Sequence, residues 1–229
     1  MKSILEKHWQ TIVNLVLVIC FLDYGFGMTR WILSFLPAEP WGQLAPFFPK
    51  RPHLGVGAGA DFVEVAFFLH NLVFLGVILF RQDHRAIETR LLPQGVALFA
   101  FFSGMWFEQT PVGDPRLLLA SDLVTLVALV FGMGCLLNLG RSFGILIAVR
   151  TVKTTGLYGM IRHPMYLSDI VWRVAYLLKN ACPRNLVLFA VSGACYVVRA
   201  MMEENFLSQF PEYREYKERV RYRFIPGIF

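Results

Sequence analysis

Residues 156–172 read Gly-Leu-Tyr-Gly-Met-Ile-Arg-His-Pro-Met-Tyr-Leu-Ser-Asp-Ile-Val-Trp, a polar cluster followed directly by an apolar run. Proline is well tolerated in the first turn of a helix, where its missing N–H leaves no hydrogen bond unmade. Pro164 is therefore predicted to begin a membrane helix, whose free N–H groups face the same side as Arg162 and His163. A helix N-terminus beside an arginine suits an anion such as a carboxylate or phosphate. A basic loop at a membrane entry explains the same residues equally well.

The composition is that of a membrane protein. Hydrophobic residues make up 56% of the 229 residues and charged residues only 17%, with a mean hydropathy of +0.52. A soluble globule needs more charge to cover its surface, so a multi-span membrane protein is the natural class. The net charge of +6 fits basic cytosolic loops, and no aromatic-basic pattern indicates nucleic-acid binding. Four cysteines without a Cys-x-x-Cys or Cys/His pairing predict neither a metal site nor a disulfide.

The apolar runs predict an all-α, polytopic fold with about six transmembrane helices in one membrane domain, residues 1–229. A Pro- and Gly-rich loop covers residues 37–60, and the tail from Pro211 alternates aromatic with charged residues, as an interfacial amphipathic helix does. The predicted spans are residues 9–36, 61–80, 92–109, 117–139, 164–180 and 184–209.

Ionisable residues inside the spans are functional candidates by default, because burying a charge in a bilayer is costly. Two pairs, Asp169 with Arg173 and Arg199 with Glu203, are spaced i, i+4, so each pair shares a helix face and can form a bridge. For Asp169 and Arg173 a self-neutralising pair is predicted. The sequence assigns no role to four further residues: Asp23, Glu64, His70 and Asp122.

Two separated motifs resemble those of the isoprenylcysteine carboxyl methyltransferase family, which is related to the integral-membrane phospholipid methyltransferases. The first is Gly156-Leu-Tyr158 followed by Arg162-His-Pro-Met-Tyr166; the second is Glu203-Glu204, then Phe210-Pro-Glu-Tyr213-Arg-Glu-Tyr216-Lys-Glu-Arg-Val220 and Ile225-Pro226. The resemblance covers about residues 131–229, the methyltransferase-like cofactor-binding region, whereas residues 1–130 form family-variable spans. The sequence departs from the family pattern at Ser168, Pro211 and Arg221, which leaves the substrate open.

The resemblance implies an S-adenosylmethionine-dependent methyltransferase. On this interpretation Arg162, His163 and the helix start at Pro164 hold the methionine carboxylate, and Glu203 or Glu204 binds the ammonium or ribose hydroxyls. Tyr158 and Tyr166 shape the pocket and face the sulfonium. Arg199 and Glu203 are the candidate catalytic residues, with Arg199 orienting the acceptor. Gly132 and Gly134 resemble the Gly-x-Gly cofactor region of phospholipid methyltransferases, although paired glycines also simply permit close helix packing.

The distribution of Lys and Arg predicts a cytosolic N-terminus, which places both motifs on the cytosolic face of the membrane. The expected partners are membrane lipids and a lipophilic or small-molecule acceptor, with a carboxylate favoured and no metal or nucleic acid. Other acceptors stay open: a phospholipid amine, or a small thiol or phenol. An NADPH-dependent membrane reductase of the sterol type and a non-enzymatic transporter are the alternatives from other classes.

Overall fold

The computed structural model describes residues 15–16, 18–19, 22, 62–110 and 114–228. The chain divides into two compact units, Met1–Phe80 and Arg81–Phe229, each of which is described by itself. The predicted single membrane domain stays a prediction. Nearly all of the predicted first span, with Asp23, and the whole predicted loop at residues 37–60 lie outside the described residues.

The first unit contains α4, which runs over Phe62–Leu79 and agrees with the span predicted at residues 61–80. Its 18 residues are apolar and long enough to cross a membrane. The buried Asn71 donates through Nδ2 to the carbonyl of Phe67 at 2.8 Å, so its amide is satisfied within the helix. The ring of His70 lies against that of Phe74, with centroids 6.3 Å apart, as a packed histidine does.

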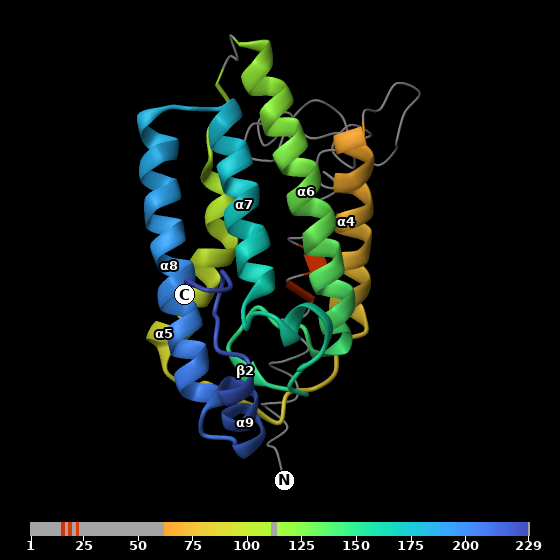
Figure 1. Ribbon diagram of the computed structural model, residues 1–229, viewed down its shortest axis with the longest axis vertical. Helices are drawn as coiled ribbons and strands as arrows, with labels where there is room; N and C mark the ends of the chain where they lie inside the picture. The colour runs from red at the N-terminus through yellow and green to blue at the C-terminus, as the bar shows by residue number, and fades with distance from the viewer. Residues whose placement is uncertain (1–14, 17, 20–21, 23–61, 111–113, 229) are drawn as a thin grey trace, which may run out of the picture. The chain divides into compact units, whose positions relative to one another are not determined.

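The second unit is built from five α-helices among the described residues (Figure 1). Two of them, α6 with the 3-10 turn η3 (Gly140–Ser142) and α8, are long and apolar enough to cross a membrane. Together with α4 they confirm a helical membrane protein, while the total of about six spans stays a prediction. The five helices are α5 Leu91–Phe102, α6 Pro115–Leu139, α7 Pro164–Lys179, α8 Pro183–Leu207 and α9 Pro211–Arg219.

Proline starts four of these helices, at the position where its missing N–H does no harm. Asp114 caps α6 by accepting a hydrogen bond from the backbone N–H of Arg116 at 2.8 Å. At the other end of α6, Gly140 adopts a φ of +52°, a conformation that favours glycine. The predicted start of a helix at Pro164 is confirmed.

The span predicted at residues 92–109 corresponds to one apolar helical stretch, Leu91–Trp106, in which α5 ends at Phe102 and continues as the 3-10 turn η2, Ser103–Trp106. The tighter turn coincides with a close helix contact. A Cβ on Gly104 would lie 3.3 Å from Nη2 of Arg173, so the guanidinium of α7 occupies the space that a side chain would need.

Within this unit α6 packs along α7, α5 packs along α8, and α7 also contacts α8. Polar contacts tie the helices together: Ser121 donates to the carbonyl of Ala175 at 2.8 Å, and Arg173 donates to that of Ala100 at 3.0 Å. The predicted Asp169–Arg173 bridge is wrong. Arg173 donates to the backbone carbonyl of Asp169, whose carboxylate instead accepts from Tyr196 at 2.9 Å, because the neighbouring helix α8 offers a better-placed donor.

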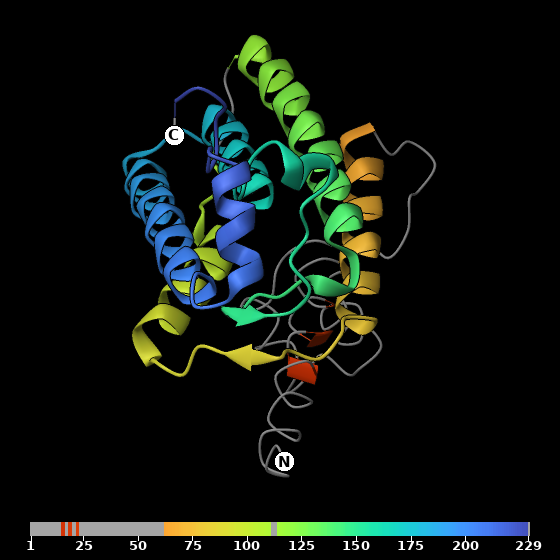
Figure 2. The ribbon, with the colours of Figure 1, turned by 60° about the horizontal axis from the view of Figure 1, so that its bottom comes forward.

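One end of this unit carries a two-stranded ribbon and the loops beside it (Figure 2). A two-stranded antiparallel ribbon pairs β1 (Ala86–Ile87) with β2 (Ala148–Val149). Gln94 at the start of α5 locks the ribbon by donating to the carbonyl of Ile147 at 3.1 Å and accepting from its N–H at 2.9 Å. The end of α8, the start of α7 and the helix α9 lie at this same end (Figure 1).

Candidate active site

The start of α7 is held by the C-terminal segment of the chain. The backbone N–H groups of Arg162 and His163 donate to the carbonyls of Tyr222 and Arg223, both at 2.9 Å. Nη1 of Arg162 donates to two further carbonyls, those of Val220 at 2.7 Å and Arg221 at 2.6 Å. Both sequence motifs therefore meet in space, and the last residues of the chain are part of the site.

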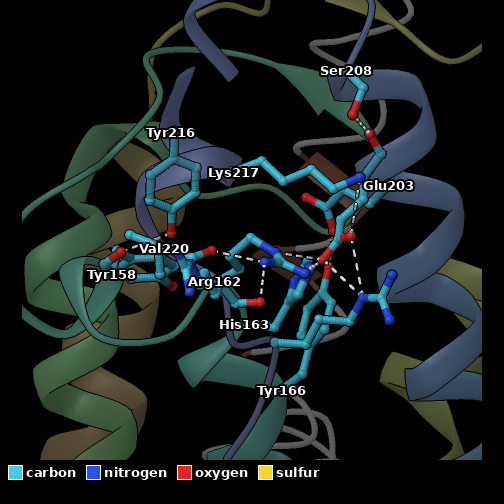
Figure 3. Close-up of polar contacts among 12 residues, drawn as sticks. Tyr158, Arg162, His163, Tyr166, Glu203, Ser208, Tyr216, Lys217 and Val220 are labelled. Carbon is cyan, nitrogen blue, oxygen red and sulfur yellow. Dashed lines mark hydrogen bonds and ion pairs between the residues drawn. The ribbon is translucent and has the colours of Figure 1, made fainter. Parts of the chain in front are cut away.

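Glu204, at the end of α8, is the centre of a cluster of cations, of which Arg162 and Lys217 are labelled in Figure 3. Its Oε1 accepts from Nε of Arg162 at 2.8 Å and lies 3.1 Å from both Nε2 of His163 and Nε of Arg223. Lys217 Nζ approaches Oε2 at 3.8 Å. The Glu204 side chain is only 1% exposed, and a carboxylate so buried needs such partners. Three permanent cations face one carboxylate, so this cluster, the Glu204 cluster, carries excess positive charge.

A second group, centred on Tyr166, lies beside the first (Figure 3). The Tyr166 hydroxyl donates to Oε2 of Glu203, and its ring stacks with that of His163 at 5.0 Å between centroids. The guanidinium of Arg199 lies over the same ring, with Cζ 4.6 Å from its centroid. The i, i+4 residues Arg199 and Glu203 form no direct ion pair in the described part of the chain. Tyr166 from α7 stands between them and links both to the Glu204 cluster.

Arg199 is buried within α8 and mostly bound to backbone carbonyls. Nη1 donates to Ala97 at 3.2 Å and Nη2 donates to Ile145 at 2.6 Å, which joins α8 to α5 and to the segment before β2. Its Nε is buried and has no hydrogen-bond partner among the described residues. One N–H donor thus stays available beside the ring of Tyr166.

Tyr158 lies in the 3-10 turn η4, Gly156–Gly159, which packs on α6. Its carbonyl accepts from the hydroxyl of Tyr216 at 2.7 Å, so α9 is bonded to the first motif. Burial raises the pKa of the Tyr158 and Tyr216 hydroxyls well above their usual value, so both stay neutral at physiological pH. Tyr158 therefore shapes the site as a neutral aromatic residue.

The predicted glycines lie within α6. Gly132 is buried, and a Cβ on Gly134 would lie 3.5 Å from Cδ1 of Leu157, an ordinary packing distance to η4. Sequence reasoning missed Asn138, whose Oδ1 is buried without a partner among the described residues and lies 2.7 Å from where a Cβ on Gly156 would stand. Its only signal in the sequence is an amide near the end of an apolar run. Across the described residues, no three His, Cys, Asp or Glu side chains gather as a metal site would require.

Comparison with known proteins gives a consistent picture. The model of the family described as phospholipid methyltransferase matches residues 116–213. Protein-S-isoprenylcysteine O-methyltransferase B of Arabidopsis thaliana is 25% identical over 173 residues, 69% of this chain and 88% of that protein. Protein-S-isoprenylcysteine O-methyltransferase A of Arabidopsis thaliana is 31% identical over 106 residues, 43% of this chain and 54% of that protein.

The solved eukaryotic intramembrane Ras methyltransferase, isoprenylcysteine carboxyl methyltransferase, aligns with 98% of this chain and 90% of its own length, at 17% identity and a TM-score of 0.48. The family match covers α6, α7 and α8 and ends in the first turn of α9. The resemblance seen in the motifs is confirmed: the chain is a membrane methyltransferase related to the phospholipid methyltransferases and the isoprenylcysteine O-methyltransferases.

Proposed function

We propose that the protein transfers a methyl group from S-adenosylmethionine to a lipophilic acceptor, with an acceptor carboxylate as the favoured nucleophile. The observation that carries this proposal is the pairing of the positively charged Glu204 cluster with the Tyr166–Glu203 group. S-Adenosylmethionine carries a carboxylate, an ammonium and a sulfonium, so it needs cations, a carboxylate and aromatic faces close together. The side chains at the start of α7 and the end of α8 supply all three.

The charges of the site support a division of roles between the two glutamates. Glu204 is already surrounded by cations, so it organises Arg162 and His163 at the start of α7 to receive the methionine carboxylate. Nε and Nη1 of Arg162 donate to protein acceptors, whereas Nη2 has no acceptor among the described residues and is therefore left for a ligand. Glu203 accepts one hydrogen bond from Tyr166 and keeps its other oxygen for the cofactor ammonium or ribose hydroxyls. Pro164, Tyr158, Gly132 and Gly134 complete the proposed cofactor site from α7, η4 and α6.

S-Adenosylmethionine, when bound, supplies a methyl group activated by its sulfonium. The protein contributes alignment of the acceptor with that group, which accounts for much of the rate of an in-line displacement. The rings of Tyr158 and Tyr166 offer faces for the positive charge, and Arg199 Nε orients the acceptor oxygen. Because an anionic nucleophile loses its charge as it attacks, a site that excludes water favours the reaction.

We further propose that the site faces the cytosol, where S-adenosylmethionine is made. The excess of Lys and Arg on the loops at the motif end supports this orientation. An exposed position on α9, Glu218→Cys in a cysteine-free background, tests it. Labelling by a membrane-impermeant maleimide in inverted vesicles but not in intact cells is expected, and the reverse pattern would reject the orientation.

The decisive experiment transfers labelled methyl from S-adenosylmethionine to a panel of acceptors by the protein in nanodiscs. A prenylated cysteine carboxylate is expected to be labelled. Labelling of phosphatidylethanolamine instead would establish the amine alternative, which the matched phospholipid methyltransferase family favours. If no acceptor is labelled and S-adenosylmethionine does not raise the melting temperature, the proposal is wrong, since a ligand that binds the native state stabilises it.

A further inference from the structure

A second polar group lies between α7 and α8, and it consists of Tyr196, Asp169 and Arg173, here called the Tyr196 group. The Tyr196 hydroxyl donates to Oδ2 of Asp169 at 2.9 Å. The guanidinium of Arg173 lies over the same ring, with Cζ 4.9 Å from its centroid. Tyr196 and Arg173 are only 1% and 3% exposed. The proposed function assigns none of these three residues a role, so the group needs an explanation of its own.

The Tyr196 group repeats the arrangement around Tyr166 with the two helices exchanged. In the proposed site, a tyrosine of α7 donates to a glutamate of α8, and an arginine one turn before that glutamate lies over the tyrosine ring. In the Tyr196 group, a tyrosine of α8 donates to an aspartate of α7, and an arginine one turn after that aspartate lies over the ring. Each helix therefore supplies one ring to the other and receives one in return.

The two arrangements touch through their rings. The centroids of the Tyr166 and Tyr196 rings are 5.5 Å apart, and the ring planes are tilted by 49°, as in aromatic pairs that are in contact. In a close-packed interior a ring cannot tilt unless its neighbour moves. The orientation of Tyr166, and with it the place where its hydroxyl meets Glu203, therefore depends on how firmly Tyr196 is held.

Arg173 fixes the Tyr196 group to α5. Its Nη2 donates to the carbonyl of Ala100 at 3.0 Å and to Oγ of Ser103 at 3.3 Å. The Ser103 hydroxyl is buried and donates to that same carbonyl at 2.9 Å. Arg199 of the proposed site donates to α5 in the same manner, at the carbonyl of Ala97 one turn earlier. Both arginines are thus bonded to one helix, and α5 sets the spacing of the two groups.

Stability alone does not explain the Tyr196 group. Burying charged groups is costly, and apolar residues of similar size often stabilise a core as well or better. Nε of Arg173 is, moreover, buried without a partner among the described residues. What directional hydrogen bonds add to apolar packing is a single orientation of the groups that make them. The Tyr196 group is therefore suited to fixing the geometry of its neighbour.

We propose that Tyr196, Asp169 and Arg173 are positioning residues for methyl transfer. They hold the ring of Tyr166 so that its hydroxyl meets Glu203, and they act through that ring without touching the reacting atoms. The inference rests on the proposed function and adds to it a second group of residues deeper in the helix bundle. Because an in-line displacement depends on alignment, losing this positioning lowers kcat more than it weakens the binding of S-adenosylmethionine.

The test compares four variants in nanodiscs, with a prenylated cysteine as the acceptor. Tyr196→Phe and Asp169→Leu each remove the hydrogen bond between the ring and the carboxylate, whereas Asp169→Asn keeps an oxygen that accepts it. Ser121→Ala is the matched control, because it removes a buried hydrogen bond between α6 and α7 at the carbonyl of Ala175, far from the start of α7. All four are assayed well below their melting temperatures.

Tyr196→Phe and Asp169→Leu are expected to lower kcat about tenfold, with the KM of S-adenosylmethionine within about twofold of wild type. Asp169→Asn and Ser121→Ala are expected to keep more than about half of the wild-type kcat, because both leave the bond to Tyr196 in place. Wild-type kcat in Tyr196→Phe and Asp169→Leu would overturn the inference. An equal loss in Asp169→Asn or in Ser121→Ala would overturn it as well.

A double variant separates positioning from stability. In protein that already carries Tyr166→Phe, the hydroxyl that is to be positioned is absent. Adding Tyr196→Phe there is expected to change kcat by less than about twofold, since two changes that act through one contact are not additive. An equal loss of kcat on adding Tyr196→Phe to wild type and to Tyr166→Phe would contradict the inference, because independent effects add.

The inference can fail separately from the proposed function. If wild-type protein methylates nothing, NMR of protein isotope-labelled at the Cζ atoms of its tyrosines still tests the positioning, with the Tyr166 signal identified by its loss in Tyr166→Phe. This signal is expected to shift or broaden in Tyr196→Phe and to stay in place in Ser121→Ala. An unaltered Tyr166 signal in Tyr196→Phe rejects the positioning role, whether or not the protein is active.

Discussion

The carboxylate of Glu204 lies 2.8 Å from Nε of Arg162, and the two side chains are only 1% and 5% exposed. Their residues are 42 positions apart in the chain, so this pair joins the end of α8 to the start of α7. His163, Lys217 and Arg223 complete the arrangement around the same carboxylate. The contact is therefore the structural centre on which both motifs depend.

Glu204→Gln is expected to destabilise the protein strongly while preserving side-chain shape. Removing one partner of a buried ion pair costs about 3–5 kcal/mol, because the remaining charges stay buried without compensation. Thermal unfolding in detergent micelles measures the loss. The neighbouring Glu203→Gln is the matched control and should melt close to wild type, so equal melting temperatures for the two variants would contradict the role given to Glu204.

Tyr166→Phe is expected to slow methyl transfer with little effect on folding. The change keeps the ring beneath Arg199 and removes only the hydroxyl that donates to Glu203. A hydrogen bond to a charged group is worth about 1.5–3 kcal/mol, and its loss in the transition state corresponds to a fall in kcat/KM of roughly 10- to 160-fold. Steady-state kinetics and melting temperature are measured together. If Tyr166→Phe has the same kcat/KM as wild type, the Tyr166 hydroxyl does not contribute to methyl transfer.

Arg199→Lys is expected to lose most of the activity although it keeps the positive charge. Lysine cannot reach the carbonyls of Ala97 and Ile145 from one planar group, nor lie flat on the ring of Tyr166. We expect kcat to fall at least about tenfold, accompanied by a lower melting temperature. Arg184→Lys, at an exposed arginine on the opposite end of α8, is the control. Full activity in Arg199→Lys would mean that charge alone suffices.

Tyr216→Phe is expected to loosen α9 from the first motif. The change leaves the carbonyl of Tyr158 buried without its donor, which costs about 1–3 kcal/mol. Hydrogen exchange should become faster in residues 156–163 and in α9, while exchange in α6 is unaltered. Tyr222→Phe, at a tyrosine that is 38% exposed, provides the comparison. Faster exchange in both variants alike would point to a general loss of stability instead.

The protein is expected to lose stability at alkaline pH through its buried tyrosines. Burial raises the pKa of Tyr158, Tyr213 and Tyr216 above the value of about 10 found in unfolded chains. A raised pKa means that the folded state holds the proton more tightly. The resulting stabilisation is complete below pH of about 10 and is lost as the pH rises toward the folded-state values. Melting temperatures measured from about pH 8 to 11 give the rate at which stability falls with pH. Tyr216→Phe should make this fall less steep. An equally steep fall in wild type and variant would contradict the role given to the buried Tyr216.

The sequence by itself determined where most of the described helices lie. A helix in a bilayer satisfies its backbone polar groups within its own segment, so apolar length and a proline at the first turn are local signals. The starts of α7 at Pro164 and α9 at Pro211 follow from those signals, as does the nature of the chain as a helical membrane protein. The early end of α5 did not follow, because Arg173 of another helix lies against Gly104.

Only the tertiary structure decided which polar groups meet. Spacing along one helix suggested that Arg199 pairs with Glu203 and Asp169 with Arg173, yet Tyr166 separates the first pair and Tyr196 takes the carboxylate of the second. The partner of a buried charge depends on how neighbouring helices rotate and pack, which no single segment encodes. The same holds for Arg150, a basic residue of the sequence whose guanidinium lies against Gly144 only because the folded chain brings the two together.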